Sequence, residues 1–121
     1  MRLFVYGTLQ SGEGNHRLLR AARLLGVRRT EARYTLVSLG AFPALLERGT
    51  TSVVGELYEV DDDTLAAVDR LEGHPHLYRR ERVHLLGGEH VEGYLLARAR
   101  GGRAPIIQDG DWRRYRCESR S

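Results

Sequence analysis

Glu72 is the residue of this chain whose type and spacing point most clearly to chemistry. It follows Leu65 and Val68 at intervals that place all three side chains on one face of a helix. A carboxylate that continues an apolar stripe points toward the interior, where burial raises its pKa. Gly73 would end the helix at this point, and the negative end of the helix dipole would raise the pKa further. Such a carboxylate suits general-base catalysis near neutral pH.

The spacing leaves one alternative open for Glu72. If the helix ended one residue earlier, the side chain would turn to solvent, as most glutamates do. Among the other acidic residues, Asp69 lies off the apolar stripe, and Glu56 and Glu59 lie on opposite faces of a predicted strand. We expect these three carboxylates to be solvated or paired.

Two tyrosines stand at the ends of predicted strands. Residues 2–6 form a β-branched and aromatic run that Gly7 stops, so Tyr6 closes a first strand and a loop follows. Tyr78 opens a later strand. Tyrosines in such positions are most often core residues whose hydroxyl finds a partner, but these hydroxyls could equally orient a substrate.

The other reactive residue types show no recognisable site. Cys117 is the single cysteine, so it cannot form an internal disulfide, and we expect a passive thiol in a polar tail. The five histidines, among them His74 and His76, have no metal-ligand spacing. The sequence therefore predicts no metal site.

The elements that must position these residues begin with the strand at residues 2–6. Apolar residues between positions 18 and 25 then fall at helical spacing up to Gly26, which predicts a first helix. Residues 34–37 and 53–60 are predicted strands. We expect them to pair antiparallel, because the connection is short and contains a turn at residues 47–50.

The helix that carries Glu72 has signals at both ends. Residues 61–63 are three aspartates, which can cap a helix N-terminus and suit its positive end. Apolar residues at helical spacing follow until Gly73. Beyond the helix, residues 78–86 and 91–97 predict two strands joined by a Gly-Gly hairpin turn.

Length and composition indicate one folded domain, residues 1–121. Hydrophobic residues make up 41% and charged residues 29% of the chain, the proportions of an ordinary globular protein. Few helices, many short strands and no sustained alternation of the two predict an α+β domain around a largely closed, mixed sheet. The segment 101–121 is expected to pack loosely apart from Trp112 and Tyr115. No apolar stretch is long enough for a membrane span or a signal peptide, so we expect a cytoplasmic protein.

The formal net charge is +3, and every basic residue of the Lys+Arg total is arginine. The excess lies in residues 17–33 and 98–120. A nucleic-acid surface would combine such a patch with stacking aromatics or a recognition helix, and neither is evident. The sequence therefore predicts no nucleic-acid partner.

Several blocks of the sequence occur together in a particular order. Phe4-Val5-Tyr6-Gly7-Thr8-Leu9 is followed by Gly12 and Asn15-His16, and a later block spans residues 68–75 with Tyr78-Arg79-Arg80 behind it. Further blocks are residues 42–44, 54–58 and 110–113. Together they resemble the γ-glutamylcyclotransferase-like, or AIG2-like, family over almost the whole chain.

This resemblance implies a compact mixed β-barrel with a few flanking helices and no metal or organic cofactor. It implies an intramolecular reaction in which the α-amine of a γ-glutamyl group attacks its own side-chain amide carbonyl, giving 5-oxoproline and a free amine. By position, Glu72 takes the catalytic role. The loop Tyr6, Gly7, Thr8 and Leu9 holds the glutamyl group, and Tyr78 is a further substrate-binding candidate.

Two classes of function are compatible with this resemblance, and a third, a basic interaction protein, rests on the net charge alone and ranks last. The first is an enzyme that acts on a small-molecule γ-glutamyl substrate, and the second is a non-catalytic small-molecule binding module on the same fold. The amine half of the substrate stays open among glutathione, γ-glutamyl amino acids, isopeptide-linked lysine and γ-glutamyl-protected metabolites. The sequence specifies no oligomeric state.

Overall fold

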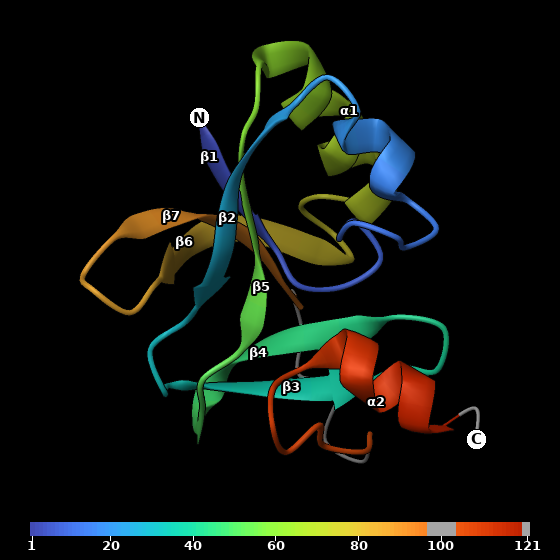
Figure 1. Cartoon of the computed structure of the whole chain (residues 1–121), viewed down its shortest axis with the longest axis vertical. Coiled ribbons are helices and arrows are strands. Elements are labelled where there is room, and N and C mark those ends of the chain that lie inside the picture. Colours follow the sequence, from blue (N-terminus) through green and yellow to red (C-terminus); the bar gives the residue numbers. More distant parts are fainter. Residues whose placement is uncertain (97–103, 120–121) are drawn as a thin grey trace.

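The computed structural model describes residues 1–96 and 104–119 of the chain. Its helices are the short 3-10 helix η1 (His16–Leu19), α1 (Asp62–Glu72) and α2 (Trp112–Ser119). Its strands are β1 (Arg2–Val5), β2 (Arg23–Arg29), β3 (Tyr34–Ser38), β4 (Pro43–Thr51), β5 (Val54–Glu59), β6 (Tyr78–His84) and β7 (His90–Leu96). Figure 1 shows their arrangement. None of the helices in the described ranges is long and apolar enough to cross a membrane.

Five strands form one mixed sheet in the order β2-β5-β1-β7-β6. The central strand β1 pairs antiparallel with β5 and parallel with β7, where Leu3 lies opposite Glu92. The two edges of the sheet approach each other at one end through an isolated bridge between Thr30 and Leu85. The predicted α+β class is thus confirmed, but the named strands do not close into the predicted barrel.

The second sheet contains only β3 and β4, which pair antiparallel. The prediction that residues 34–37 pair with residues 53–60 is therefore wrong. The expected turn at residues 47–50 lies inside β4 instead. The strand passes so close to its partner at Gly49 that a Cβ there would stand 2.3 Å from the Tyr34 carbonyl oxygen, and the register shifts at this point. Gly49, which the sequence predicts as part of a turn, instead allows two strands to approach closely within the sheet.

The predicted helix over residues 18–25 is also wrong. Only η1 is helical there, and the chain continues as the edge strand β2. β2 pairs antiparallel with β5 from Arg23, opposite Glu59, to Arg29, opposite Val54, with an irregularity between Leu24 and Gly26. Apolar spacing cannot anticipate a partner strand thirty residues away, and tertiary pairing overrode the local preference.

Helix α1 begins and ends as the sequence predicts. The Asp61 side chain accepts a hydrogen bond from the Thr64 amide at 2.7 Å, which satisfies a free N–H of the first turn. Gly73 takes the left-handed conformation at φ 67° and caps the last turn. The predicted β6–β7 hairpin is confirmed as well, although its second strand was expected to reach Ala97, which lies outside the described residues.

Two apolar clusters form the core, and β1 contributes to both. Phe4 and Tyr6 belong to one cluster, whereas Leu3 and Val5 belong to the other. This alternation means that β1 is buried on both faces. The residues that follow β1 therefore emerge from the middle of the molecule, which is where the candidate site lies.

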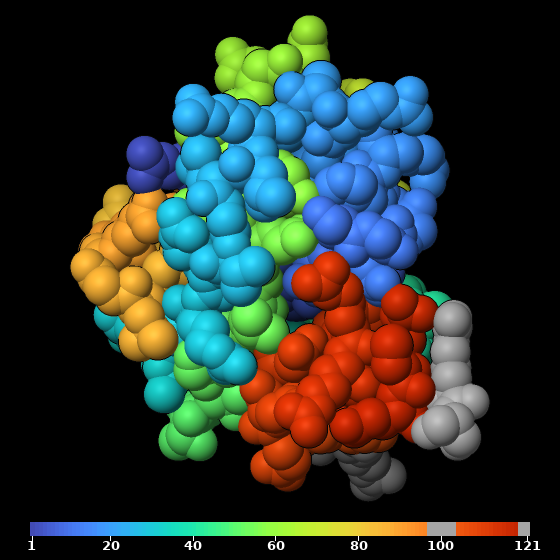
Figure 2. Space-filling model, in the orientation of Figure 1, coloured from blue at the N-terminus to red at the C-terminus, as the bar shows by residue number. Residues whose placement is uncertain are grey.

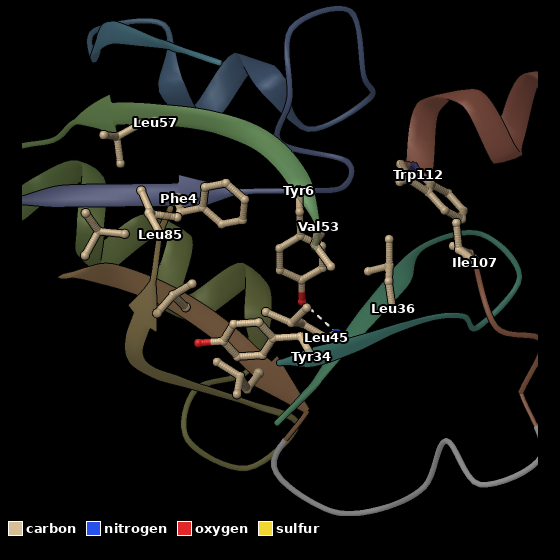
Figure 3. Packing of buried hydrophobic residues seen from close by; sticks show 13 residues of the cluster. Phe4, Tyr6, Tyr34, Leu36, Leu45, Val53, Leu57, Leu85, Ile107 and Trp112 are labelled. Carbon is tan, nitrogen blue, oxygen red and sulfur yellow. Dashed lines mark hydrogen bonds between the residues drawn. The ribbon is translucent and has the colours of Figure 1, made fainter. Parts of the chain in front are cut away.

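The C-terminal segment contains a helix that the sequence did not predict. Trp112, the first residue of α2, is 1% exposed and packs in the same cluster as Ile107 and Leu36, as Figure 3 shows. In Figure 1, α2 lies beside the β3–β4 sheet. The described part of segment 101–121 thus contributes directly to the core.

Candidate active site

A pocket of about 370 Å³ lies where α1 ends and the loop after β1 begins. Its walls come from five parts of the chain: the end of β1 with its loop, the start of β4, the last turn of α1, the start of β6, and β7. The lining residues are 4–9, 15, 41–43, 71–72, 77–78 and 94. All six residues predicted for the site from the sequence are among them.

Glu72 is the last residue of α1 and lines this pocket. Leu65 and Val68 on the same helical face are buried, so the stripe predicted from the sequence does face the interior. Burial raises the pKa of Glu72 from 4.5 to about 7. Within the described residues, Glu72 makes no hydrogen bond and no ion pair, so its carboxylate is available to a ligand.

The loop after β1 is held by hydrogen bonds to its oxygen atoms. The Gly7 carbonyl accepts from the Gln10 amide at 3.1 Å, and the Thr8 carbonyl accepts from the Asn15 amide at 2.9 Å. The Asn15 side chain also donates to the Thr8 hydroxyl at 2.9 Å. Among the described residues, no acceptor takes the amide N–H groups of Thr8 and Leu9, so these donors can serve a ligand.

Gly7 allows this loop to pass close to β4. A Cβ at Gly7 would stand 2.7 Å from Cγ of Pro43, closer than side chains approach. Glycine is therefore required here by space rather than by an unusual φ. The contact brings the loop against the start of β4, and both line the pocket that contains Glu72.

Tyr6 and Tyr78 line the pocket, but both hydroxyl groups are bound to the protein backbone. The Tyr6 hydroxyl donates to the Tyr94 carbonyl at 2.6 Å and accepts from the Leu45 amide at 3.1 Å, the bond dashed in Figure 3. The Tyr78 hydroxyl donates to the Pro43 carbonyl at 2.8 Å. Burial raises the pKa of both tyrosines, and the nearby charge of Glu72 raises them further. They stay neutral and present mainly ring surface to the pocket.

Tyr94 is a pocket residue that the sequence did not single out. Its hydroxyl donates to Oδ1 of Asp69 at 2.6 Å. Asp69 lies about one turn before Glu72 in α1. Arg80 joins Asp69 to Glu92 through two hydrogen bonds of 3.0 Å each. This network fastens the end of α1 to the β6–β7 hairpin. Tyr94 lies in a strand of alternating residues, and nothing in its neighbouring sequence indicated that its side chain would reach the pocket.

The other three acidic residues considered from the sequence have partners within the protein. Asp69 is paired as expected, and Glu59 pairs with the N-terminal amine at 3.2 Å. Glu56 is buried and accepts a hydrogen bond from the Ser11 amide at 2.7 Å. In the described ranges, no group of three or more His, Cys, Asp and Glu side chains is arranged to hold a metal ion.

Known proteins resemble this chain over most of its length. The family model described as "Gamma-glutamyl cyclotransferase, AIG2-like" matches residues 3–114. The chain belongs to this family. A Vibrio cholerae protein named as a candidate γ-glutamylcyclotransferase is 51% identical over 110 residues, which cover 91% of this chain and 93% of the relative.

Two solved structures show the same fold. An uncharacterised protein of Pyrococcus horikoshii superposes with a TM-score of 0.82 at 28% identity, covering 99% of this chain and 96% of that one. An AIG2-like protein of Mus musculus superposes with a TM-score of 0.72 at 29% identity, covering 88% of this chain and 85% of the mouse chain. The α+β γ-glutamylcyclotransferase-like fold is thus established.

Proposed function

We propose that the protein is a γ-glutamylcyclotransferase that converts a γ-glutamyl amide to 5-oxoproline and a free amine, with Glu72 as the general base. The observation that carries this proposal is the partly buried Glu72 carboxylate, whose pKa of about 7 suits proton transfer at neutral pH. It lines one pocket together with the loop of residues 7–9. The family membership supports the same chemistry.

The reaction needs no group beyond the substrate and this base. The α-ammonium of the substrate gives a proton to the Glu72 carboxylate, and the resulting amine attacks the γ-carbonyl carbon. A C–N bond forms and closes the five-membered ring. Glu72 then gives that proton to the nitrogen of the leaving amine as the original amide C–N bond breaks. The ring nitrogen still carries one proton too many, which the Glu72 carboxylate accepts and passes on to the released amine or to solvent, leaving 5-oxoproline with a neutral ring amide. Because both reacting groups belong to one molecule, holding the substrate folded supplies much of the rate enhancement.

The loop of Tyr6, Gly7, Thr8 and Leu9 is proposed to hold the glutamyl group. Its free amide N–H groups can donate to the oxygen that becomes negatively charged during ring closure. A positioned donor of this kind is worth about 3 kcal/mol of transition-state stabilisation. Tyr78 contributes its ring as a wall of the pocket, since its hydroxyl is already bound to Pro43.

The test is turnover of a panel of γ-glutamyl amides, with 5-oxoproline detected by mass spectrometry. We expect the unmodified protein to release 5-oxoproline and Glu72→Gln to lose at least about 100-fold in kcat, because the amide cannot accept the proton. Glu59→Gln is the matched control, since Glu59 is exposed and lies outside the pocket.

Two results would count against this function. Full activity of the Glu72→Gln variant would remove the proposed base. Binding of γ-glutamyl amides without turnover by the unmodified protein would instead indicate the non-catalytic binding module.

The expected cytoplasmic location stays a prediction from the sequence.

A further inference from the structure

Three large apolar side chains that line the pocket are also exposed to solvent, and we call them the mouth of the pocket. Phe42, Leu71 and Leu77 are 38%, 41% and 44% exposed, and all three line the pocket that contains Glu72. They come from separate elements: the residue before β4, the last turn of α1, and the loop before β6. Single exposed apolar residues are ordinary, but a cluster around one opening marks a binding surface.

Contacts near the reactive carboxylate place these side chains around the same opening. Leu71 directly precedes Glu72 in α1. Leu77 packs over the helix end, since a Cβ built on Gly73 would stand 3.1 Å from Cβ of Leu77. The Phe42 ring meets the Tyr78 ring edge to face, with 6.4 Å between centroids.

The direction of the substrate follows from the proposed function. The amide bond that breaks must lie beside Glu72, and the glutamyl half lies toward the loop of residues 7–9. The amine half then extends from Glu72 toward the exposed side of the pocket, which Phe42, Leu71 and Leu77 line. Apart from Glu72, no charged side chain lines this pocket in the part of the chain that the structure describes. The mouth therefore offers a charged amine half no partner, whereas an apolar chain would cover exposed apolar surface.

We infer that this enzyme prefers γ-glutamyl amides whose amine half is an apolar alkyl or aryl chain, and that Phe42, Leu71 and Leu77 determine this preference. The inference rests on the proposed function, because it assumes that the bond to be broken lies at Glu72. The cavity of about 370 Å³ is near the lower limit of small-molecule sites, so it suits a compact amine rather than a polypeptide.

The experiment compares three substrates that differ only in the amine half: the γ-glutamyl amides of 3-methylbutylamine, 3-hydroxypropylamine and 1,4-diaminobutane. We expect kcat/KM to be at least about tenfold higher for the 3-methylbutyl amide, the range that one or two buried methyl groups give in an apolar pocket. Leu77→Ser and Phe42→Ser are expected to reduce this preference to about twofold. Leu77→Met should preserve it.

Leu86→Ser is the matched control, because Leu86 is 58% exposed in the β6–β7 connection and lies outside the pocket. It should leave the ratio between the substrates unchanged. Equal kcat/KM values for the apolar and the hydroxylated amide would overturn the inference while leaving the cyclotransferase activity intact.

A different result would separate the two proposals. If none of the amides is turned over, the proposed function fails. Calorimetric measurement of how tightly the amides bind to the unmodified protein then tests whether the mouth of the pocket is an apolar subsite. Tighter binding of the 3-methylbutyl amide than of the 3-hydroxypropyl amide, reduced in Leu77→Ser, would support an apolar subsite. Equal binding would overturn it.

Discussion

Glu72 combines two properties that usually exclude each other, a position in an apolar wall and an ionisable group. The helix face that buries Leu65 and Val68 carries its carboxylate into the pocket, where burial raises the pKa to about 7. An ionised group in such surroundings lowers the stability of the folded protein. The residue proposed to do the chemistry is therefore expected to destabilise the fold at alkaline pH.

This destabilisation has a measurable sign. The pKa of Glu72 is about 7 when folded and 4.5 in the unfolded chain, so the folded state binds the proton more tightly. Its contribution to stability is fully present below pH 4.5 and is lost as pH rises through about 7. Glu72→Gln should thus be more stable than the unmodified protein at pH 8, by up to about 3 kcal/mol, and no more stable at pH 4.

Urea unfolding at the two pH values checks this prediction. The exposed Glu59→Gln serves as control, since removing a charge from the surface should produce no such gain at pH 8. A Glu72→Gln variant whose advantage is the same at pH 4 and pH 8 would show that Glu72 is ionised normally in the folded protein.

At the scale of elements, α2 holds the segment that follows the substrate loop. Arg116 forms an ion pair with Glu13, whose side chain is 4% exposed, and the Trp112 indole donates to Glu13 at 3.2 Å. Arg113 donates to the Ser11 carbonyl at 2.8 Å. Figure 2 shows α2, in red, lying against the blue N-terminal segment. A helix about 100 residues away thus positions the loop that lines the pocket.

Removing Arg116 should loosen that loop. In Arg116→Met the Glu13 carboxylate keeps only its bond to Trp112 and remains buried, so we expect a loss of about 2 kcal/mol in stability. Hydrogen exchange of the amides in residues 10–15 should accelerate, whereas exchange in the β6–β7 hairpin should not. Arg114→Met is the control, because the Arg114 side chain is 66% exposed and its ion pairs lie at the surface. Unchanged exchange in residues 10–15 would argue against this role of α2.

For the whole molecule, the two apolar clusters on either side of β1 connect the sheets and helices into one unit. Trp112 is the largest side chain in the cluster that contains Phe4 and Tyr6. This cluster also contains residues of β1, β3, β4, β5, β6 and β7. The strands that surround the pocket therefore depend on a core that the C-terminal segment completes.

Trp112→Ala should lower the free energy of unfolding by about 3–5 kcal/mol, because it leaves a large cavity in this shared core. The loss should appear as a lower midpoint of one cooperative urea transition, monitored both by far-UV circular dichroism and by hydrogen exchange. Trp112→Phe, which fills much of the space but loses the bond to Glu13, should lose about half as much. Separate melting of α2 ahead of the strands would contradict a common core.

Local signals in the sequence were enough for α1, its caps, the β6–β7 hairpin and the apolar stripe that Glu72 continues, although they left open whether its side chain turns to solvent. Each depends on residues within a few positions of one another, such as Asp61 with Thr64 or Gly73 with the last helical turn. Six residues that line the candidate pocket were predicted from the family resemblance, whereas its other lining residues were not.

Tertiary structure decided the rest. It made residues 23–29 a strand rather than a helix, docked α2 on the core, recruited Tyr94 and opened an apolar mouth at Phe42 and Leu77. Each of these features depends on partners about 30 to 100 residues away, and spacing within one segment contains no information about such partners. The sequence by itself therefore placed Glu72 on the apolar stripe of its helix, and only the folded chain decided that its side chain faces the pocket and what surrounds it.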